Sequence, residues 1–141
     1  MASLFTRIID GEIPGRFVWR DERCVAFATI APLHAGHVLV VPIEEVDHWL
    51  DLAPDLAAHL FGVAQVIGQA QMTAFSPVRV GLIVAGLEVP HTHLHVVPID
   101  SEAELDFARA DHGASGESLD RAAEALRGAL RFAGRSEVAD A

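Results

Sequence analysis

Three histidines alternate with other residues in one short segment of this chain. His91, His93 and His95 lie in the sequence HTHLHVVP, which runs from His91 to Pro98. Successive side chains of a β-strand point to opposite faces, so the pattern predicts one row of imidazoles with Thr92 turned the other way. Histidine titrates near neutral pH and serves as a base, acid, nucleophile or metal ligand. A polar solvent face on an ordinary strand is the simpler interpretation, but strict alternation of three among eight histidines favours a functional row.

A metal site is one chemical interpretation of this row. A strand rises about 3.3 Å per residue, which puts the backbones of His91 and His95 about 13 Å apart. With metal–nitrogen bonds of about 2.1 Å, both rings can hardly reach one ion. A metal would need an adjacent pair and a further ligand, such as His34 or His37. The sequence contains a single cysteine, Cys24, and therefore no Cys-x-x-Cys motif, so we expect no metal.

Nucleophilic catalysis is the other interpretation. A neutral ring nitrogen can attack phosphorus and form a covalent phosphohistidine, which divides one difficult displacement into two easier steps. The second ring nitrogen must then keep its proton on a fixed acceptor, so that the correct tautomer faces the substrate. Because His93 has a histidine on each side, we predict that it is the nucleophile and that its neighbours donate protons. His37 follows Gly36 and supplies a fourth imidazole if its strand pairs beside the row.

Five segments have the composition of β-strands. The run over 38–42 is continuously apolar, which is typical of a strand buried on both faces. Prolines and glycines separate the segments from one another. The predicted strands cover residues 17–19, 24–30, 38–42, 78–84 and 91–98.

Two segments have the helical period. Leu56, Leu60, Val63 and Ile67 recur at spacings of three and four after Pro54, which suits a first helical turn, and this helix should end near residue 75. A second amphipathic helix is predicted over 117–132. The polar stretch over 100–118 is expected to be irregular, and residues 136–141 are expected to fray. The order of strands and helices predicts one α+β domain with a mainly antiparallel sheet.

The bulk composition excludes several classes of protein. The chain has 141 residues, 51% hydrophobic and 21% charged, which is typical of one globular domain. It has no apolar run long enough for a membrane span and no basic start followed by an apolar stretch, so we expect neither a membrane anchor nor a secretory signal. The single cysteine favours a reducing cytoplasm. A net charge of −10 opposes binding to nucleic acids but permits a small anionic ligand.

The histidine segment resembles the signature of the histidine triad (HIT) family, His-φ-His-φ-His-φ-φ, where φ is an apolar residue. The similarity also covers the opening at 4–14, the second strand at 26–32, the Gly-His strand at 35–42 and the approach to the triad at 85–90. The resemblance implies the HIT-like α+β fold, with an antiparallel five-stranded sheet, one long central helix and a C-terminal helix. It further implies a HIT domain over 1–110 and a helical extension over 111–141, packed on the domain or on a dimer partner.

The resemblance also implies a function. Such proteins are nucleotidyl hydrolases or transferases that act on the α-phosphate of a phosphoramidate, an ester or a dinucleoside polyphosphate. His93 would carry the transient nucleotidyl group, with His95 and His37 at the phosphate and His91 supporting the row. By position, the base would lie against three residues that are equally compatible with a core role, namely Phe5, Ile8 and Phe27. No cofactor is implied, and the expected assembly is a homodimer with the sheet running through its interface.

Several positions differ from the family pattern. Some relatives bind structural zinc through cysteines at Ser3 and Thr6 and a histidine near Glu45, so we expect no zinc here. The nucleotide-binding position Thr29 replaces an aspartate that contacts the ribose, and Glu88 stands where a serine or threonine is usual. A carboxylate beside a phosphate is repulsive, which supports an alternative: a low-turnover nucleotide-binding or scaffold protein that keeps the pocket.

The remaining histidines are expected at the surface, namely His48, His59 and His112.

Overall fold

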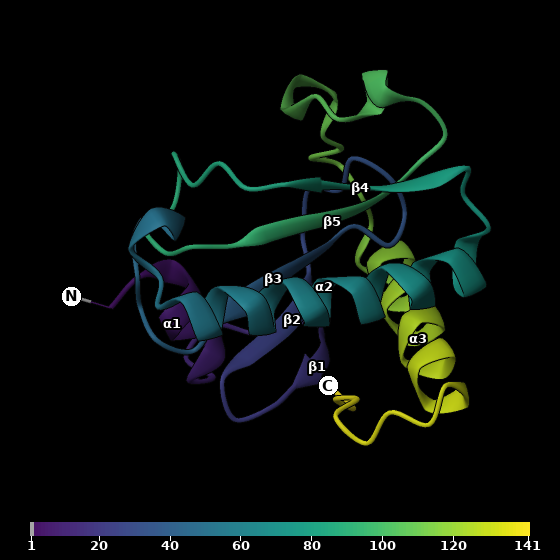
Figure 1. Ribbon diagram of the computed structural model, residues 1–141. Helices are drawn as coiled ribbons and strands as arrows, with labels where there is room; N and C mark the ends of the chain where they lie inside the picture. The colour runs from purple at the N-terminus through teal and green to yellow at the C-terminus, as the bar shows by residue number, and fades with distance from the viewer. Residues whose placement is uncertain (1) are drawn as a thin grey trace.

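One antiparallel sheet organises the chain. The structure is a computed structural model, and it describes residues 2–141. Five strands lie in the order β1-β2-β3-β5-β4, and every neighbouring pair is antiparallel (Figure 1). The α+β class and the five-stranded sheet are therefore as predicted. The strands are β1 (Phe17–Arg20), β2 (Cys24–Ala28), β3 (Val38–Pro42), β4 (Arg79–Ile83) and β5 (Leu94–Ile99).

Three α-helices accompany the sheet: α1 (Leu4–Ile9), α2 (Pro54–Phe75) and α3 (Gly116–Phe132). Pro54 occupies the first turn of α2, and Ser76 ends the helix in a left-handed conformation with φ of 50°. The two long helices agree with the predicted ranges. The short α1 was not predicted, because six residues carry too little periodicity to reveal a helix. Three 3₁₀ turns complete the elements: η1 (Trp49–Asp51), η2 (Glu102–Glu104) and η3 (Phe107–Arg109).

The two faces of the sheet are both buried, but against different partners. On one face, alternate residues of β3 and β5 pack with α2 and α3 in a core that includes the fully buried Leu60, Ile67 and Leu126. On the other face, Phe27 and Leu39 pack against α1. This division follows from the period of two along each strand. The histidines therefore lie on the face of the sheet that α1 covers.

The C-terminal segment pairs with the sheet and does not fray, contrary to the expectation for residues 136–141. The backbone N–H of Arg20 donates to the carbonyl of Glu137 over 2.9 Å, and that of Ala139 donates to the carbonyl of Val18 over 3.1 Å. The unpaired hydrogen-bonding groups at the edge of β1 provide the physical reason. One edge of the sheet is thereby covered, and β4 forms the other.

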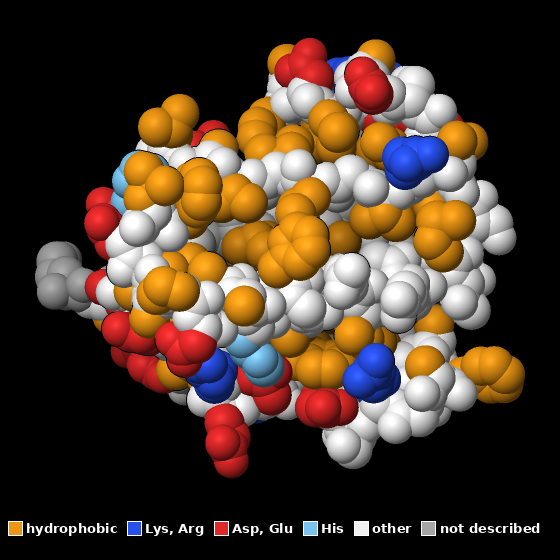
Figure 2. Space-filling model, in the orientation of Figure 1, with side chains coloured by type: hydrophobic (Ala, Val, Ile, Leu, Met, Phe, Trp, Pro, Cys, Tyr) orange, Lys and Arg blue, Asp and Glu red, His pale blue; other side chains and the backbone are white. Residues whose placement is uncertain are grey.

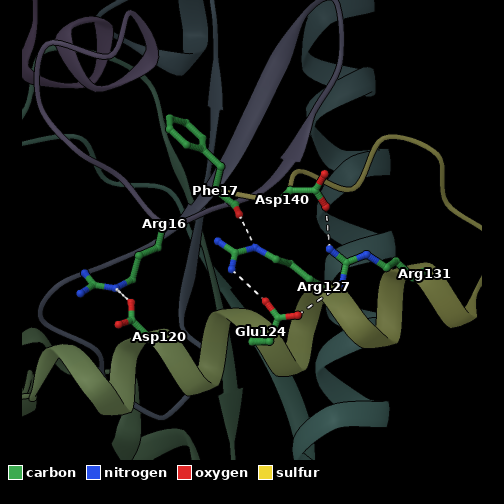
Figure 3. A network of polar contacts seen from close by, with 7 residues as sticks. All are labelled: Arg16, Phe17, Asp120, Glu124, Arg127, Arg131 and Asp140. Carbon is green, nitrogen blue, oxygen red and sulfur yellow. Dashed lines mark hydrogen bonds and ion pairs between the residues drawn. The ribbon is translucent and has the colours of Figure 1, made fainter.

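Charged residues of α3 connect this helix to β1 and to the C-terminal segment, as Figure 3 shows. The guanidinium of Arg127 is buried and donates to the carbonyl of Phe17 in β1 over 2.8 Å. Arg131 pairs with Asp140 of the C-terminal segment at 2.7 Å, and Glu124 lies between the two arginines. Helix α3 thus belongs to the same hydrophobic core as the sheet. The proposed division into residues 1–110 and 111–141 stays a prediction.

Among residues 2–141, no helix combines the length and the apolar character that crossing a bilayer requires.

Candidate active site

The histidine row is present, although only its last member lies in a strand. β5 begins at Leu94 and not at His91, because Thr92 pairs outside the sheet: its N–H and its hydroxyl both donate to the carbonyl of Val46. The rings nevertheless share the α1 face. The ring centroids of His93 and His95 are 4.9 Å apart.

His93 presents one defined tautomer. Its Nδ1 lies 2.7 Å from the carbonyl oxygen of His91, and a carbonyl can only accept. Nδ1 therefore carries the proton, and Nε2 carries a lone pair. The Phe5 ring and the imidazole pack in a T-shaped arrangement, with centroids 4.8 Å apart and planes at 82°, which fixes the orientation of the imidazole.

His95 presents the complementary tautomer, and His37 sets it. The backbone N–H of Leu33 donates to His37 Nδ1 over 3.1 Å, so His37 carries its proton on Nε2. That Nε2 lies 2.9 Å from His95 Nδ1 and donates to it. His95 therefore keeps its proton on Nε2. A lone pair on His93 and an N–H on His95 thus lie on neighbouring rings.

Burial keeps these imidazoles neutral. It lowers the pKa of His37 to about 3, with a further contribution from the neighbouring charge of His95. It lowers the pKa of His95 to about 4, with His93 adding to the effect. The pKa of His93 is also lowered, mainly by burial, while its hydrogen bond to the His91 carbonyl and the charge of Glu88 oppose the shift. Near neutral pH, Nε2 of His93 is therefore unprotonated.

A pocket of about 260 Å³ opens onto these rings. Of the residues predicted to bind nucleotide or to catalyse, it is lined by Thr29, His37, Glu88, His93 and His95. Its remaining lining comes from two turns and from a segment beyond β5: Ala31, Ala85, Gly86, Leu87, Phe107, Ala110 and His112.

Three residues that we expected to hold the base lie elsewhere. Phe5, Ile8 and Phe27 do not line this pocket and are only 5%, 9% and 4% exposed. The ring of Phe5 packs against the rings of Phe27, at 5.6 Å between centroids, and of His93. Packing of α1 onto the sheet leaves these side chains little free surface, so in this structure they are core residues.

Two of the pocket residues that were not found from the sequence carry aromatic rings. Phe107 packs against His95 with ring centroids 4.8 Å apart and planes tilted by 57°. His112, which was expected at the surface only, lines the same pocket although it is exposed. The N–H of Asp111 anchors their segment to the carbonyl of Pro32 over 2.9 Å. No local pattern in this polar stretch signals such a long-range contact.

His91 lies outside the pocket and is completely buried. Its Nε2 donates to the carbonyl of Pro42 and its Nδ1 accepts from the hydroxyl of Ser3, each over 2.7 Å. Glu45 accepts from the N–H of Ser3 and from the hydroxyl of Thr6 at 2.6 and 2.8 Å, and these bonds hold its pKa below the usual range. A four-residue polar cluster therefore ties α1 to the histidine row.

Gln71 of α2 supports the site from the opposite face of the sheet. Its side chain is completely buried, and Nε2 donates to the carbonyls of Gly36 and Val96 at 2.9 and 2.8 Å. These carbonyls belong to the residues next to His37 and His95. The Gln71 amide thus fixes the backbone beside both His37 and His95.

The buried imidazoles make stability depend on pH. An unfolded histidine binds a proton near its ordinary pKa of 6.5, whereas folded His37 resists protonation until about pH 3. In this window only the unfolded state gains the proton, so the free energy of unfolding falls as pH falls. We expect a loss of about 2–3 kcal/mol from His37 alone between pH 7 and about pH 4.5, measured by urea unfolding. His37→Asn should reduce the slope, and a free energy independent of pH in this range would contradict the burial of neutral imidazoles.

Comparison with known proteins agrees with this geometry. Residues 10–102 match the family model of the HIT domain. The chain belongs to the HIT family. It is 35% identical over 99 residues to a HIT-like protein of Methanocaldococcus jannaschii, covering 67% of this chain and 77% of that one. A bis(5'-nucleosyl)-tetraphosphatase of Schizosaccharomyces pombe is 32% identical over 98 residues, covering 66% of this HIT protein and 52% of the relative.

The fold agrees as well. A zinc-bound histidine triad family protein from Mycobacterium smegmatis superposes with a TM-score of 0.82 and 25% identity, over 95% of this chain and 96% of that one. The polar cluster of Ser3, Thr6, Glu45 and His91 does not suit such an ion. Zinc in structural sites favours thiolate and imidazole ligands, whereas two of these side chains are neutral hydroxyls that already hydrogen-bond.

Proposed function

We propose that this HIT protein is a nucleotidyl hydrolase or transferase. It acts on the α-phosphate of a nucleoside monophosphate conjugate through a covalent intermediate on His93. The observation that carries the proposal is the pair of complementary tautomers in one pocket: a lone pair on His93 Nε2 beside an N–H on His95 Nε2. A nucleophile and a hydrogen-bond donor for the phosphoryl oxygen are the two groups that this displacement requires.

The reaction proceeds in two displacements. His93 Nε2 attacks phosphorus, the bond from phosphorus to the leaving nitrogen or oxygen breaks, and the leaving atom takes the electron pair and a proton from water. His95 Nε2–H stabilises charge on the phosphoryl oxygen. Water then attacks phosphorus, the bond to His93 breaks, and the proton released to solvent restores the one taken. His37 and His91 hold the two tautomers through their hydrogen bonds.

Family membership supports the nucleotide as substrate, and one relative carries the name of a tetraphosphatase. The alternative is a nucleotide-binding or scaffold protein with low turnover. The observation that favours it is the carboxylate of Glu88 in the same pocket as His93, because a bound phosphate would be repelled there. A cytoplasmic location is part of the proposal, supported by the single, buried cysteine.

Trapping the intermediate separates the two functions. Wild-type protein is mixed with a fluorogenic adenosine phosphoramidate, quenched in base within the first turnover and digested. We expect a nucleoside monophosphate mass increment on the peptide that contains His93, together with a burst of released amine. Tight binding of nucleoside monophosphate with neither a burst nor an adduct would support the scaffold alternative.

The assembly proposed for this protein is a homodimer built on the open edge of the sheet. A groove of about 450 Å³ between α2 and β4 is lined by exposed apolar side chains, among them Phe61, Met72, Val78 and Leu82. Figure 2 shows hydrophobic side chains gathered over this part of the surface. Apolar surface beside an unpaired strand edge suits a second copy of the same sheet.

Replacing Leu82 by aspartate is therefore expected to produce monomers, because the new charge would be buried in the interface. The measurement is molar mass by light scattering, which should give twice the 15.1 kDa of the chain for wild type and 15.1 kDa for the variant. Phe132→Asp is the matched control, since Phe132 is 91% exposed and lies outside the groove. A monomeric wild type would overturn the dimer.

A further inference from the structure

The pocket beside His93 contains one carboxylate and no guanidinium or ammonium group. Glu88 is the only carboxylate in its lining, and no arginine lines it. The sequence holds no lysine at all. Within residues 2–141, no ion pair involves Glu88. A charged group that enters beside His93 therefore meets an uncompensated negative charge.

Two apolar side chains accompany this carboxylate. Phe107 is 43% exposed and Leu87 is 96% exposed, and both line the pocket. Aromatic faces attract organic cations, and apolar side chains pack against methylene groups. A carboxylate, an aromatic ring and an aliphatic side chain together form the set that recognises an alkylammonium group.

We propose that Glu88, with Phe107, selects nucleotide conjugates whose leaving group carries an ammonium, and disfavours anionic leaving groups such as polyphosphates. This inference rests on the proposed nucleotidyl transfer to His93. The phosphate itself is bound by neutral imidazoles, because the buried rings carry no charge near neutral pH. Neither arginine nor lysine is present in the lining to offset the repulsion between Glu88 and a second phosphate.

The chemistry is the displacement already described, applied to a phosphoramidate of a diamine. The phosphorus–nitrogen bond breaks, the bond from phosphorus to His93 Nε2 forms, and the leaving nitrogen takes the electron pair and a proton from water. The distal ammonium keeps its proton and its contact with Glu88 throughout. Selection therefore acts on binding and orientation of the leaving group and does not alter the bonds that change.

A series of three adenosine phosphoramidates tests the charge preference directly. Their leaving amines have equal length but different distal groups: diaminobutane is cationic, pentylamine is neutral and aminobutyrate is anionic. For wild type, we expect kcat/KM to fall about tenfold from the cationic to the neutral conjugate, and about tenfold again to the anionic one. Added salt should reduce the differences in kcat/KM among the three conjugates, because Glu88 is exposed to solvent and its charge is screened.

Glu88→Gln is expected to bring the three rates within about threefold of one another and to raise hydrolysis of diadenosine tetraphosphate, since the amide removes the charge at constant shape. Glu22→Gln removes the same charge from an exposed turn outside the pocket and should leave the series unchanged. Assays contain a chelator, so that no divalent ion bridges Glu88 to a polyphosphate. Phe107→Leu should reduce the preference for the cationic conjugate severalfold.

The outcomes distinguish the two proposals. Equal rates for the three conjugates in wild type, or a preference that survives Glu88→Gln, would overturn the role of Glu88 and leave nucleotidyl transfer intact. Failure of wild type to cleave any of the conjugates or the tetraphosphate would instead overturn the proposed function on which the inference rests.

Discussion

Replacing His93 by asparagine is expected to lower kcat/KM for a nucleoside phosphoramidate by a factor of about a thousand or more, because the covalent route is lost. The asparagine amide can still donate to the carbonyl of His91, which accepts a hydrogen bond from His93 Nδ1 over 2.7 Å in the native protein. The change therefore removes the proposed nucleophile while keeping the local hydrogen bond. Turnover is measured by release of the fluorogenic amine.

Two measurements keep this result interpretable. Circular dichroism and urea unfolding should show that the His93→Asn variant is folded, and nucleoside monophosphate should still bind to it. His48→Asn is the matched control, since His48 is exposed and lies outside the pocket. If His93→Asn kept activity within tenfold of wild type, His93 could not be the nucleophile.

Replacing Gly36 by alanine is expected to have the largest effect on stability, about 2–5 kcal/mol in the free energy of unfolding. Gly36 has φ of 87°, a conformation that strains any residue with a Cβ. A Cβ there would also clash with the ring of Phe75, lying 2.7 Å from Cζ. Both effects follow from the tight turn that delivers His37 to the mouth of β3.

Urea unfolding measures this loss, and Gly62→Ala provides the control. Gly62 lies inside α2 with nothing within 4 Å of an added Cβ, so alanine there should stabilise the helix by about 0.5–1 kcal/mol. The double variant Gly36→Ala with Phe75→Leu should recover part of the loss by relieving the clash. Activity should also fall in Gly36→Ala, because the carbonyl held by Gln71 belongs to this residue. An unaltered free energy would show that the turn is not strained.

Local patterns predicted the five strands, the two long helices and the histidine row, but not the contacts made over long distances in the chain. Strict alternation revealed the shared face of His91, His93 and His95 even though β5 begins only at Leu94. It could not reveal that Thr92 pairs with Val46, since that bond joins segments far apart in sequence.

The same limit explains the other differences. Phe107 packs against His95 only because the segment after β5 folds back to Pro32, and nothing in its composition indicates that path. Phe5 suited both a binding role and a core role, and its burial follows from the position of α1, which the sequence did not reveal. The C-terminal residues pair with β1 because the edge of the sheet is free, which is a property of the folded sheet and not of the tail sequence.

The cluster that joins the first helix to the triad has a chemical consequence. Ser3, Thr6, Glu45 and His91 connect through hydrogen bonds alone, without a thiol among them. A thiolate–zinc junction at this position would loosen when its sulfur is oxidised or its ion is captured by a competing ligand. The hydrogen-bonded cluster depends on neither a thiol nor a metal ion. Peroxide and metal starvation therefore leave the hydrogen bonds that hold His91 intact.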